Sequence, residues 1–379
     1  MASTHSSRRL DGTLFALLLV LAAATAFVSA AAARGDALAA RHERWMAKFG
    51  REYTDAAEKL RRQEVFAANA RHVEAVNRAG NRTYTLGLNQ FSDLTSEEFA
   101  EKHLGYRHQH GVDSTPVAAV NMSNAQFDST PDSVDWRAAG AVTQVKNQGS
   151  CGCCWAFAAV AATEGLVKIA TGNLISMSEQ QVLDCTGGAN SCNGGDINAA
   201  LSYVASSGGL QPEESYAYTG QQGACRSSSA SPNSAASIGA PRMVELHGDE
   251  GTLQELAARQ PVAVPVEADR DFQHYMRGVY TGSSSCGQNL NHGVTVVGYG
   301  TDSGGQAYWM VKNQWGTGWG EGATCASRAG TAATAAWPPT PTTRPWTALK
   351  HHYYCTSVGP CIIEYYSLSA PCSIYGFTF

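Results

Sequence analysis

The densest group of reactive side chains lies between Gln148 and Trp155, in the segment Gln-Gly-Ser-Cys-Gly-Cys-Cys-Trp. The alanine-rich run that follows, as far as Lys168, predicts a helix, which places Cys154 on its first turn. The positive end of a helix dipole favours a thiolate, which is the nucleophilic form of cysteine. Three interpretations are open: half of a disulfide, a Cys151/Cys154 redox pair or metal corner, and a nucleophile that a distant base activates.

A base and an amide lie far downstream of this segment. His292 lies in Leu-Asn-His-Gly-Val, and Asn313 begins the segment Asn-Gln-Trp-Gly-Thr-Gly-Trp-Gly. A thioredoxin-like redox pair needs a βαβ context, and a zinc site needs a second ligand pair at knuckle spacing. We find neither pattern in the sequence, whereas a thiol, an imidazole and an amide suit nucleophilic catalysis.

The elements that must position these residues change in character along the chain. A second helix is predicted over residues 197–206. Residues 262–266, 294–299 and 308–312 are short β-branched or aromatic runs bounded by Gly and Asn, which predicts strands. This order predicts an α+β fold in which a helical half packs against a sheet half, with a cleft between them.

The three reactive segments, in this order, resemble those of the papain-like cysteine peptidases of the cathepsin L-like or plant type, which carry a His and an Asn about 130–150 residues after the Cys. The resemblance runs from about Arg41 to Gly322 and implies a helical subdomain beside a barrel-like sheet subdomain. It implies that a Cys154 thiolate, paired with the His292 imidazolium, attacks peptide bonds. It further implies that Asn313 orients the imidazole and that Gln148 and the Cys154 N–H form the oxyanion hole. No cofactor and no metal is expected.

The resemblance also implies where a polypeptide substrate would lie. Gly194 and Gly195 would bring bare backbone to an extended substrate, and a hydrophobic pocket would be lined around Gly293, Asn291 and Pro265. Pro265 departs from the expected pattern because proline inside a central strand removes a hydrogen-bond donor. Trp315 would shield the contact between the histidine and the asparagine from water.

Eleven cysteines form an odd set, so at least one of them has no partner within the chain. The resemblance implies two disulfides, Cys151–Cys192 and Cys185–Cys225. Cys153 replaces a small residue beside the nucleophile, and we expect a free thiol there. The family's third disulfide would use Cys286, whose expected partner is missing. The sequence does not choose among the alternative partners Cys325, Cys355, Cys361 and Cys372.

A helix predicted from Thr54 to Asn77, with Thr54 or Asp55 as its N-cap, carries an unusual face. At 100° per residue, six residues of this helix fall on one face, and they resemble the family's ERFNIN propeptide pattern with Val in place of Ile. A Gly-Asn-Phe-Asp pattern follows the helix. A purely structural interpretation of Glu58 and Arg62 is an i,i+4 ion pair on the helix surface. The resemblance instead implies an inhibitory propeptide that occludes the cleft until acid weakens a network of Glu58, Arg62 and Asp93. The pattern residues are Glu58, Arg62, Phe66, Asn69, Val73, Asn77, Gly87, Asn89, Phe91 and Asp93.

Composition and the N-terminus complete the domain organisation. Lys plus Arg is 27 and Asp plus Glu is 32, so the net charge of −5 provides no basic field for nucleic acid. A signal peptide is predicted over 1–33, from Arg8 and Arg9, an apolar run over 14–28 and small residues as far as 33. The apolar run is too short to span a membrane. We expect a propeptide over 34–130, with an exposed linker from about His103, and a peptidase domain over 131–322. The signal peptide predicts a protein of the secretory pathway, extracellular or in a vacuole or lysosome, and we expect it to be a monomer.

Residues 323–379 depart from the family. The family expects a strand here, whereas the chain reads Ala-Thr-Cys-Ala-Ser-Arg-Ala-Gly, then a Thr/Ala/Pro-rich run and an aromatic tail. One hypothesis is a shifted reading frame, since GC-rich codons for this segment can encode Gly-Tyr-Met-Arg-Ile in another frame. We expect an unpaired sheet edge where the strand is lost. The alternative function is an inactive product that acts at most as a propeptide-type peptidase inhibitor.

Overall fold

The computed structural model describes residues 7–107, 130–226, 242–245, 250–282, 289–322, 324–328 and 361–364. The chain forms two compact units, Met1–Arg71 and His72–Phe379. Cys286, Cys355 and Cys372 lie outside the described residues, as do the side chains of Cys325 and Cys361.

The first unit consists of helix α1 (Ser7–Phe49) and most of α2 (Ala56–Ala79). Asp55 caps α2, because its Oδ1 accepts the backbone N–H of Glu58 at 2.7 Å. Phe66 is fully buried, with ring centres 5.0 Å from His42 and 5.3 Å from Trp45. The aromatic position of the predicted helix face is therefore a packing residue that joins α2 to α1.

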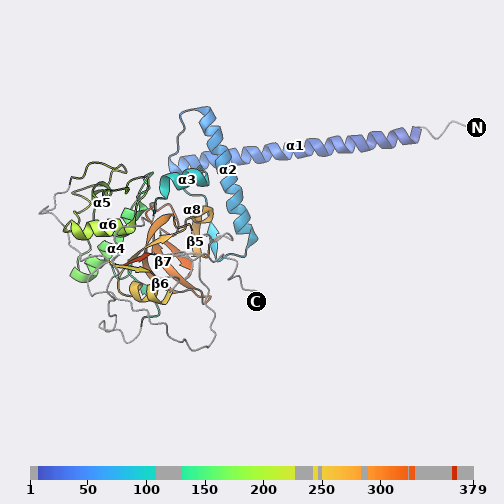
Figure 1. Ribbon diagram of the computed structural model, residues 1–379. Coiled ribbons are helices and arrows are strands. Elements are labelled where there is room, and N and C mark those ends of the chain that lie inside the picture. The colour runs from blue at the N-terminus through green and yellow to red at the C-terminus, as the bar shows by residue number, and fades with distance from the viewer. Residues whose placement is uncertain are drawn as a thin grey trace, which may run out of the picture. The chain divides into compact units, whose positions relative to one another are not determined.

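The helical part of the second unit holds α4 (Cys154–Thr171), α5 (Glu179–Cys185) and α6 (Ile197–Ser206), which Figure 1 shows together in green. The predicted helices over 155–168 and 197–206 are confirmed. Among the described residues, α4 is long and apolar enough to cross a membrane, but 72% of it is buried inside the protein. Such burial is typical of a core helix, and α4 ends at Gly172, whose φ of 80° is left-handed.

The sheet of the second unit has the order β1-β5-β8-β7-β6-β4-β9-β3 among the described residues, and β2 pairs with β6. Short helices accompany it: α3 (Ser96–His103), α7 (Glu250–Ala257) and α8 (Arg270–Gln273). The three predicted strands correspond to β4, β6 and β7. The strands are β1 (Tyr84–Leu86), β2 (Val134–Asp135), β3 (Arg242–Glu245), β4 (Val262–Val266), β5 (Tyr275–Tyr280), β6 (His292–Thr301), β7 (Ala307–Lys312), β8 (Thr324–Arg328) and β9 (Cys361–Glu364).

The helices and strands together give the predicted α+β fold. In Figure 1 the green helices α4–α6 lie to one side of the orange strands β5–β7. Residues of α4 contact β6, since Thr295 donates its hydroxyl hydrogen to the Ala158 carbonyl at 3.3 Å. The boundary between helices and sheet therefore passes along α4.

The expected loss of the strand after Asn313 is wrong. Residues 324–328 form β8, which pairs antiparallel with β7, placing Val311 opposite Cys325, and parallel with β5. Strand pairing uses backbone N–H and C=O groups, so it does not require the family's side chains at these positions. The sheet edge that we expected to be unpaired is covered.

Pro265 lies inside β4, opposite Gly293 of β6. Pairing continues past it, to Val266 opposite His292. On the other side of β4, the described part of β9 pairs with this strand at Ala263 and not at Pro265. Pro265 therefore has a neighbouring strand on one side only, which is a position where proline is tolerated.

Candidate active site

Cys154 is the first residue of α4 and is fully buried. The turn before it is fixed by the Cys151–Cys192 disulfide and by a 2.7 Å hydrogen bond from the Gly152 N–H to the Cys192 carbonyl. A second disulfide joins Cys185 to Cys225, so both pairs are those that the resemblance implies. Cys153 and Cys154 are free thiols, as expected for Cys153, whose Sγ lies 3.0 Å from the Tyr218 hydroxyl.

His292 begins β6, and Asn313 directly follows β7. Because these strands pair antiparallel, with Thr295 opposite Lys312, the two side chains meet. His292 Nε2 lies 2.9 Å from Asn313 Oδ1, and both residues are buried. His292 Nδ1 is buried and has no hydrogen-bond partner among the described residues, so one ring nitrogen remains for another reactant.

Two side chains next to Asn313 hold this pair in place. The Trp315 ring stacks on the His292 ring, with centres 4.5 Å apart and planes at 28°. Gln314 donates from Nε2 to the Gly293 carbonyl at 2.8 Å. The sequence indicated Trp315 but not Gln314, although Gln314 lies inside the quoted Asn-Gln-Trp-Gly segment.

Gly293 brings the histidine strand against the nucleophile helix. A Cβ at Gly293 would lie 3.1 Å from the Cys154 carbonyl oxygen and 3.3 Å from Ile197 Cδ1. The close approach of β6 to α4 thus leaves little room for a side chain. The nucleophile helix of the helical part and the histidine strand of the sheet part therefore meet at Gly293.

Gln148 is fully buried beside the nucleophile turn. Its Nε2 donates to the Cys151 carbonyl at 2.8 Å and to the His103 carbonyl at 3.1 Å. Its backbone carbonyl accepts the Tyr218 hydroxyl hydrogen at 2.7 Å. The Gln148 amide is therefore fixed in position. One of its two acceptors, the His103 carbonyl, belongs to the segment 103–107.

That segment lies in the cleft, so the exposed linker expected from His103 is wrong for residues 103–106. His103, Leu104 and Tyr106 are each at most 9% exposed. The Gly105 and Tyr106 N–H groups donate to the Asn291 carbonyl, both at 3.0 Å. The Gly195 N–H donates to the Gly105 carbonyl at 2.8 Å, and the Arg107 N–H donates to the Gly195 carbonyl at 2.9 Å. Residues 108–129 of the expected linker lie outside the described residues.

The predicted substrate-binding residues gather around this segment. Gly195 and Asn291 hydrogen-bond it directly, and a Cβ at Gly194 would lie 2.9 Å from the Gly105 carbonyl oxygen. Gly293 of β6 lies opposite Pro265 of β4, and the Trp315 ring stacks on the His292 ring. Gly194, Gly195 and Asn291 therefore contact the chain's own backbone at residues 105–107.

Burial decides the charge state of the two reactive groups. It raises the pKa of the Cys154 thiol to about 11, against the opposing backbone N–H groups of Gly293, Gly105 and Trp155. It lowers the pKa of His292 to about 3, although the hydrogen bond to Asn313 opposes this. At neutral pH both groups are uncharged, so the helix dipole does not produce a thiolate in this covered state. The expected thiolate–imidazolium pair concerns an open cleft, whereas residues 103–107 cover both groups here.

Residues Gly87 to Phe91 attach the covering segment to the sheet part. The Gly87 N–H donates to the His274 carbonyl at 2.8 Å, and Asn89 Nδ2 donates to the Gln273 carbonyl at 2.7 Å. The Phe91 ring meets Trp315 edge-on at 5.6 Å between centres. A Cβ at Gly87 would lie 2.5 Å from Met276 Cε, so this glycine permits a close approach. Asp93 is buried beside this region, at 4% exposure.

The end of α2 supports the same attachment. Asn77 donates from Nδ2 to the Leu86 carbonyl and accepts the Leu86 N–H at Oδ1, both at 2.9 Å. Val73 packs in one core cluster with Leu86 and Phe91, and β1 pairs antiparallel with β5. Asn69, on the preceding turn of α2, is buried.

Glu58 and Arg62 form an i,i+4 ion pair at 2.7 Å, and Arg61 also bonds Glu58. The hydrogen bond from Arg62 lowers the pKa of Glu58, with a further contribution from Arg61. A carboxyl group with a lowered pKa keeps its pair down to its ordinary titration range, near 4, and loses it only below that range. Mild acid therefore leaves this ion pair intact.

The site has a cysteine at the start of a helix and a histidine that is held by an asparagine. Its cleft is filled by a segment from the N-terminal part of the same chain. These features define a thiol peptidase in an inhibited form. Residues 130–335 match the papain family cysteine protease domain, and residues 42–99 match the cathepsin propeptide inhibitor domain. The chain belongs to the papain family of cysteine proteases and carries its inhibitory propeptide.

Relatives of known name agree with this assignment. The chain is 42% identical to fruit bromelain of Ananas comosus over 308 residues, covering 81% of this chain and 86% of bromelain. It is 46% identical to senescence-specific cysteine protease SAG39 of Oryza sativa subsp. indica over 316 residues, covering 81% and 90%. Among solved structures, recombinant stem bromelain precursor matches with a TM-score of 0.68 at 38% identity, covering 79% and 94%. Procathepsin L 3 of Tenebrio molitor larval midgut matches with a TM-score of 0.67 at 32% identity, covering 78% and 96%.

These comparisons make the chain a cysteine-type endopeptidase with a propeptide, and they give no support to the alternative of an inactive product. The match to the peptidase domain ends at residue 335, beyond the boundary at 322 that the sequence predicted.

Proposed function

We propose that Cys154 is the nucleophile of this peptidase and that His292 is its base and acid. The Cys154 sulfur attacks the scissile carbonyl carbon, and the His292 imidazolium gives its proton to the leaving amine. Water, deprotonated by His292, then attacks the thioester and releases the acid product and the free thiol. The observation that carries this proposal is the 2.9 Å contact between His292 Nε2 and Asn313 Oδ1, which leaves Nδ1 for the thiol.

Gln148 Nε2 supplies one donor of the oxyanion hole, together with the Cys154 N–H. The support is that Nε2 already donates to a carbonyl oxygen, that of His103, in the covered state. Removing one such donor typically costs about 10²–10³ in rate. Gly195 and the Asn291 carbonyl bind the backbone of an extended polypeptide substrate, since both hydrogen-bond the segment that now fills the cleft.

Removal of residues 103–107 activates the enzyme. While they cover Cys154 and His292, burial keeps both groups neutral. Once the cleft is open to water, that penalty falls, and the thiolate–imidazolium pair becomes accessible. Maturation in the secretory pathway, ending outside the cell or in a vacuole or lysosome, agrees with the signal-like N-terminus.

The test compares two adjacent cysteines. The processed enzyme hydrolyses a peptide amide, and Cys154→Ala abolishes this hydrolysis. Cys153→Ala is the matched control, because Cys153 is also a buried free thiol but points to Tyr218. Loss of activity in Cys153→Ala with full activity in Cys154→Ala would overturn the assignment of the nucleophile.

A further inference from the structure

A cavity of about 460 Å³ opens on the helical part of the peptidase. Neither Cys154, His292 nor Asn313 lines it, so it is distinct from the catalytic cleft. Its size lies within the range of small-molecule sites, roughly 300–1,000 Å³. Apolar side chains, one lysine and two carboxylates share its wall: Val145, Phe157, Leu174, Lys146, Glu179 and Glu213.

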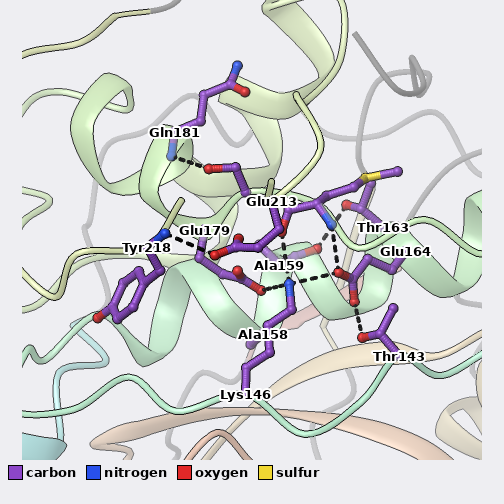
Figure 2. A network of polar contacts seen from close by, with 12 residues as sticks. Thr143, Lys146, Ala158, Ala159, Thr163, Glu164, Glu179, Gln181, Glu213 and Tyr218 are labelled. Carbon is purple, nitrogen blue, oxygen red and sulfur yellow. Dashed lines mark hydrogen bonds and ion pairs between the residues drawn. The ribbon is translucent and has the colours of Figure 1, made fainter. Parts of the chain in front are cut away.

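Both carboxylates have one unused oxygen. Glu179 is 1% exposed and its Oε1 accepts from Lys146 Nζ at 2.7 Å, while its Oε2 is buried and accepts no hydrogen bond from a described residue. Glu213 Oε1 accepts the Tyr218 N–H at 2.9 Å, and its Oε2 is likewise buried and unpaired. Figure 2 shows the two carboxylates near each other, on the Tyr218 side of Lys146. A buried carboxylate oxygen without a donor is costly unless something else fills the position.

This network has fewer positively charged side chains than carboxylates. The Lys146 ammonium is shared between Glu179 and Glu164, which lies 2.9 Å away on its other side, as Figure 2 shows. Lys312, the second cation, lies 4.0 Å from Glu164 and donates to the Thr143 hydroxyl. In the described part of the chain, two lysines therefore face three carboxylates, and Glu213 has no cationic partner.

The same shortage is visible in the titration of Glu179. Burial raises its pKa to about 8, and Glu164 and Glu213 add to this, while Lys146 opposes it. A carboxyl group with a raised pKa binds its proton more tightly, so a cation bound at Glu179 Oε2 would compete with that proton.

The wall of the cavity selects among cations. Ca²⁺ takes six to eight oxygen ligands, and Mg²⁺ requires near-octahedral oxygen geometry. Two free carboxylate oxygens beside Val145, Phe157 and Leu174 do not supply this. An ammonium group with an apolar body suits both parts of the wall, since it donates charge-assisted hydrogen bonds while its body covers the apolar side chains.

We propose that this cavity is a second ligand site, which binds an organic ammonium group through Glu179 Oε2 and Glu213 Oε2. The ammonium nitrogen lies between the two carboxylates, and the carbon body packs on Phe157 and Leu174. The site adjoins the catalytic side of the molecule through Tyr218, whose hydroxyl donates to the Gln148 carbonyl.

The test is isothermal titration calorimetry on the full chain carrying Cys154→Ala, which removes self-cleavage. Benzylammonium is the probe, and benzyl alcohol is its uncharged counterpart. A second arm uses Nα-acetyl-lysine methylamide, which distinguishes a free amine from a lysine side chain as the source of the ammonium group. Binding of at least one ammonium probe, at least tenfold tighter than benzyl alcohol, is the expected result.

Two variants each remove one carboxylate charge. Glu213→Gln keeps an oxygen for the Tyr218 N–H, and Glu179→Gln keeps one for Lys146. Each is expected to weaken benzylammonium binding at least tenfold, whereas Glu214→Gln, an exposed neighbour outside the cavity wall, leaves it unchanged. If Glu179→Gln does not fold, Glu213→Gln alone decides. Absent binding, equal binding of benzyl alcohol, or unchanged binding in Glu213→Gln would each overturn the proposal. All measurements use a chain without the nucleophile, so they are independent of the proposed catalytic roles.

Discussion

Replacing Gly105 with alanine should open the zymogen without any cleavage. A Cβ at Gly105 would lie 1.9 Å from the Gly152 carbonyl oxygen and 2.6 Å from the Gly152 carbonyl carbon. Gly152 is held in place, because its N–H donates a hydrogen bond to the Cys192 carbonyl beside the Cys151–Cys192 disulfide. The segment over the nucleophile must move instead.

The size of the effect follows from two hydrogen bonds. Gly105 donates to the Asn291 carbonyl at 3.0 Å and accepts from the Gly195 N–H at 2.8 Å. At about 1 kcal/mol each, their loss weakens the covered state by about 2 kcal/mol, or roughly 30-fold in the population of the open state. Opening also relieves the burial that holds the pKa of Cys154 near 11, so the thiol becomes more reactive at the same time.

The assay is alkylation of Cys154 in the uncleaved full chain at pH 7 by a thiolate-directed epoxide, with peptide mapping and intact mass to exclude cleaved molecules. The Gly105→Ala chain should be labelled about 30-fold faster than the wild type. Gly35→Ala makes the same change in the N-terminal region at a position with open space, and it should behave as wild type. A labelling rate of Gly105→Ala within twofold of the wild type would show that residues 103–107 do not control access to Cys154.

Three further outcomes are expected. Asn313→Ala should lower the kcat of the processed enzyme about 10²-fold with little change in KM, because His292 loses its orienting partner; an unchanged kcat for a fluorogenic peptide would contradict this. Gln148→Ala should lower kcat by about 10²–10³, and an effect confined to KM would argue against an oxyanion role. Burial raises the pKa of Asp271, but hydrogen bonds from His72 and Tyr84 outweigh it and leave that pKa lowered, so its stabilisation is full above about pH 4 and lost below. The melting temperature of Asp271→Asn should therefore fall less than that of the wild type between pH 5 and 2.5, and parallel curves would refute this.

Local patterns were sufficient where an element or site depends on nearby residues. The helix over 197–206 and the strand over 262–266 have the predicted bounds, since each is an apolar run between turn residues. Cys154, His292 and Asn313 come from motifs in a fixed order, and pairing of two predicted strands brings the last two together.

The sequence was insufficient where contacts are distant and use the backbone. Leu104 to Tyr106 have no periodicity, and they are held by carbonyl and N–H groups of Asn291 and Gly195, far along the chain. Side-chain types cannot indicate such bonds. The raised pKa of Cys154 could not be predicted for the same reason, because the helix end is visible in the sequence while the segment that covers it is not.

Strand β8 has a consequence for how this gene can change. The strand joins β7 and β5 although its residues, Thr-Cys-Ala-Ser-Arg, differ from the family pattern. A position whose bonds are made by the main chain tolerates many side chains but not proline, which lacks the donor. A drift in coding sequence, or even a change of reading frame, can therefore preserve this part of the sheet, provided that the first few new codons avoid proline. The first proline after β8 is Pro338, so no proline interrupts the pairing of this strand with β7 and β5.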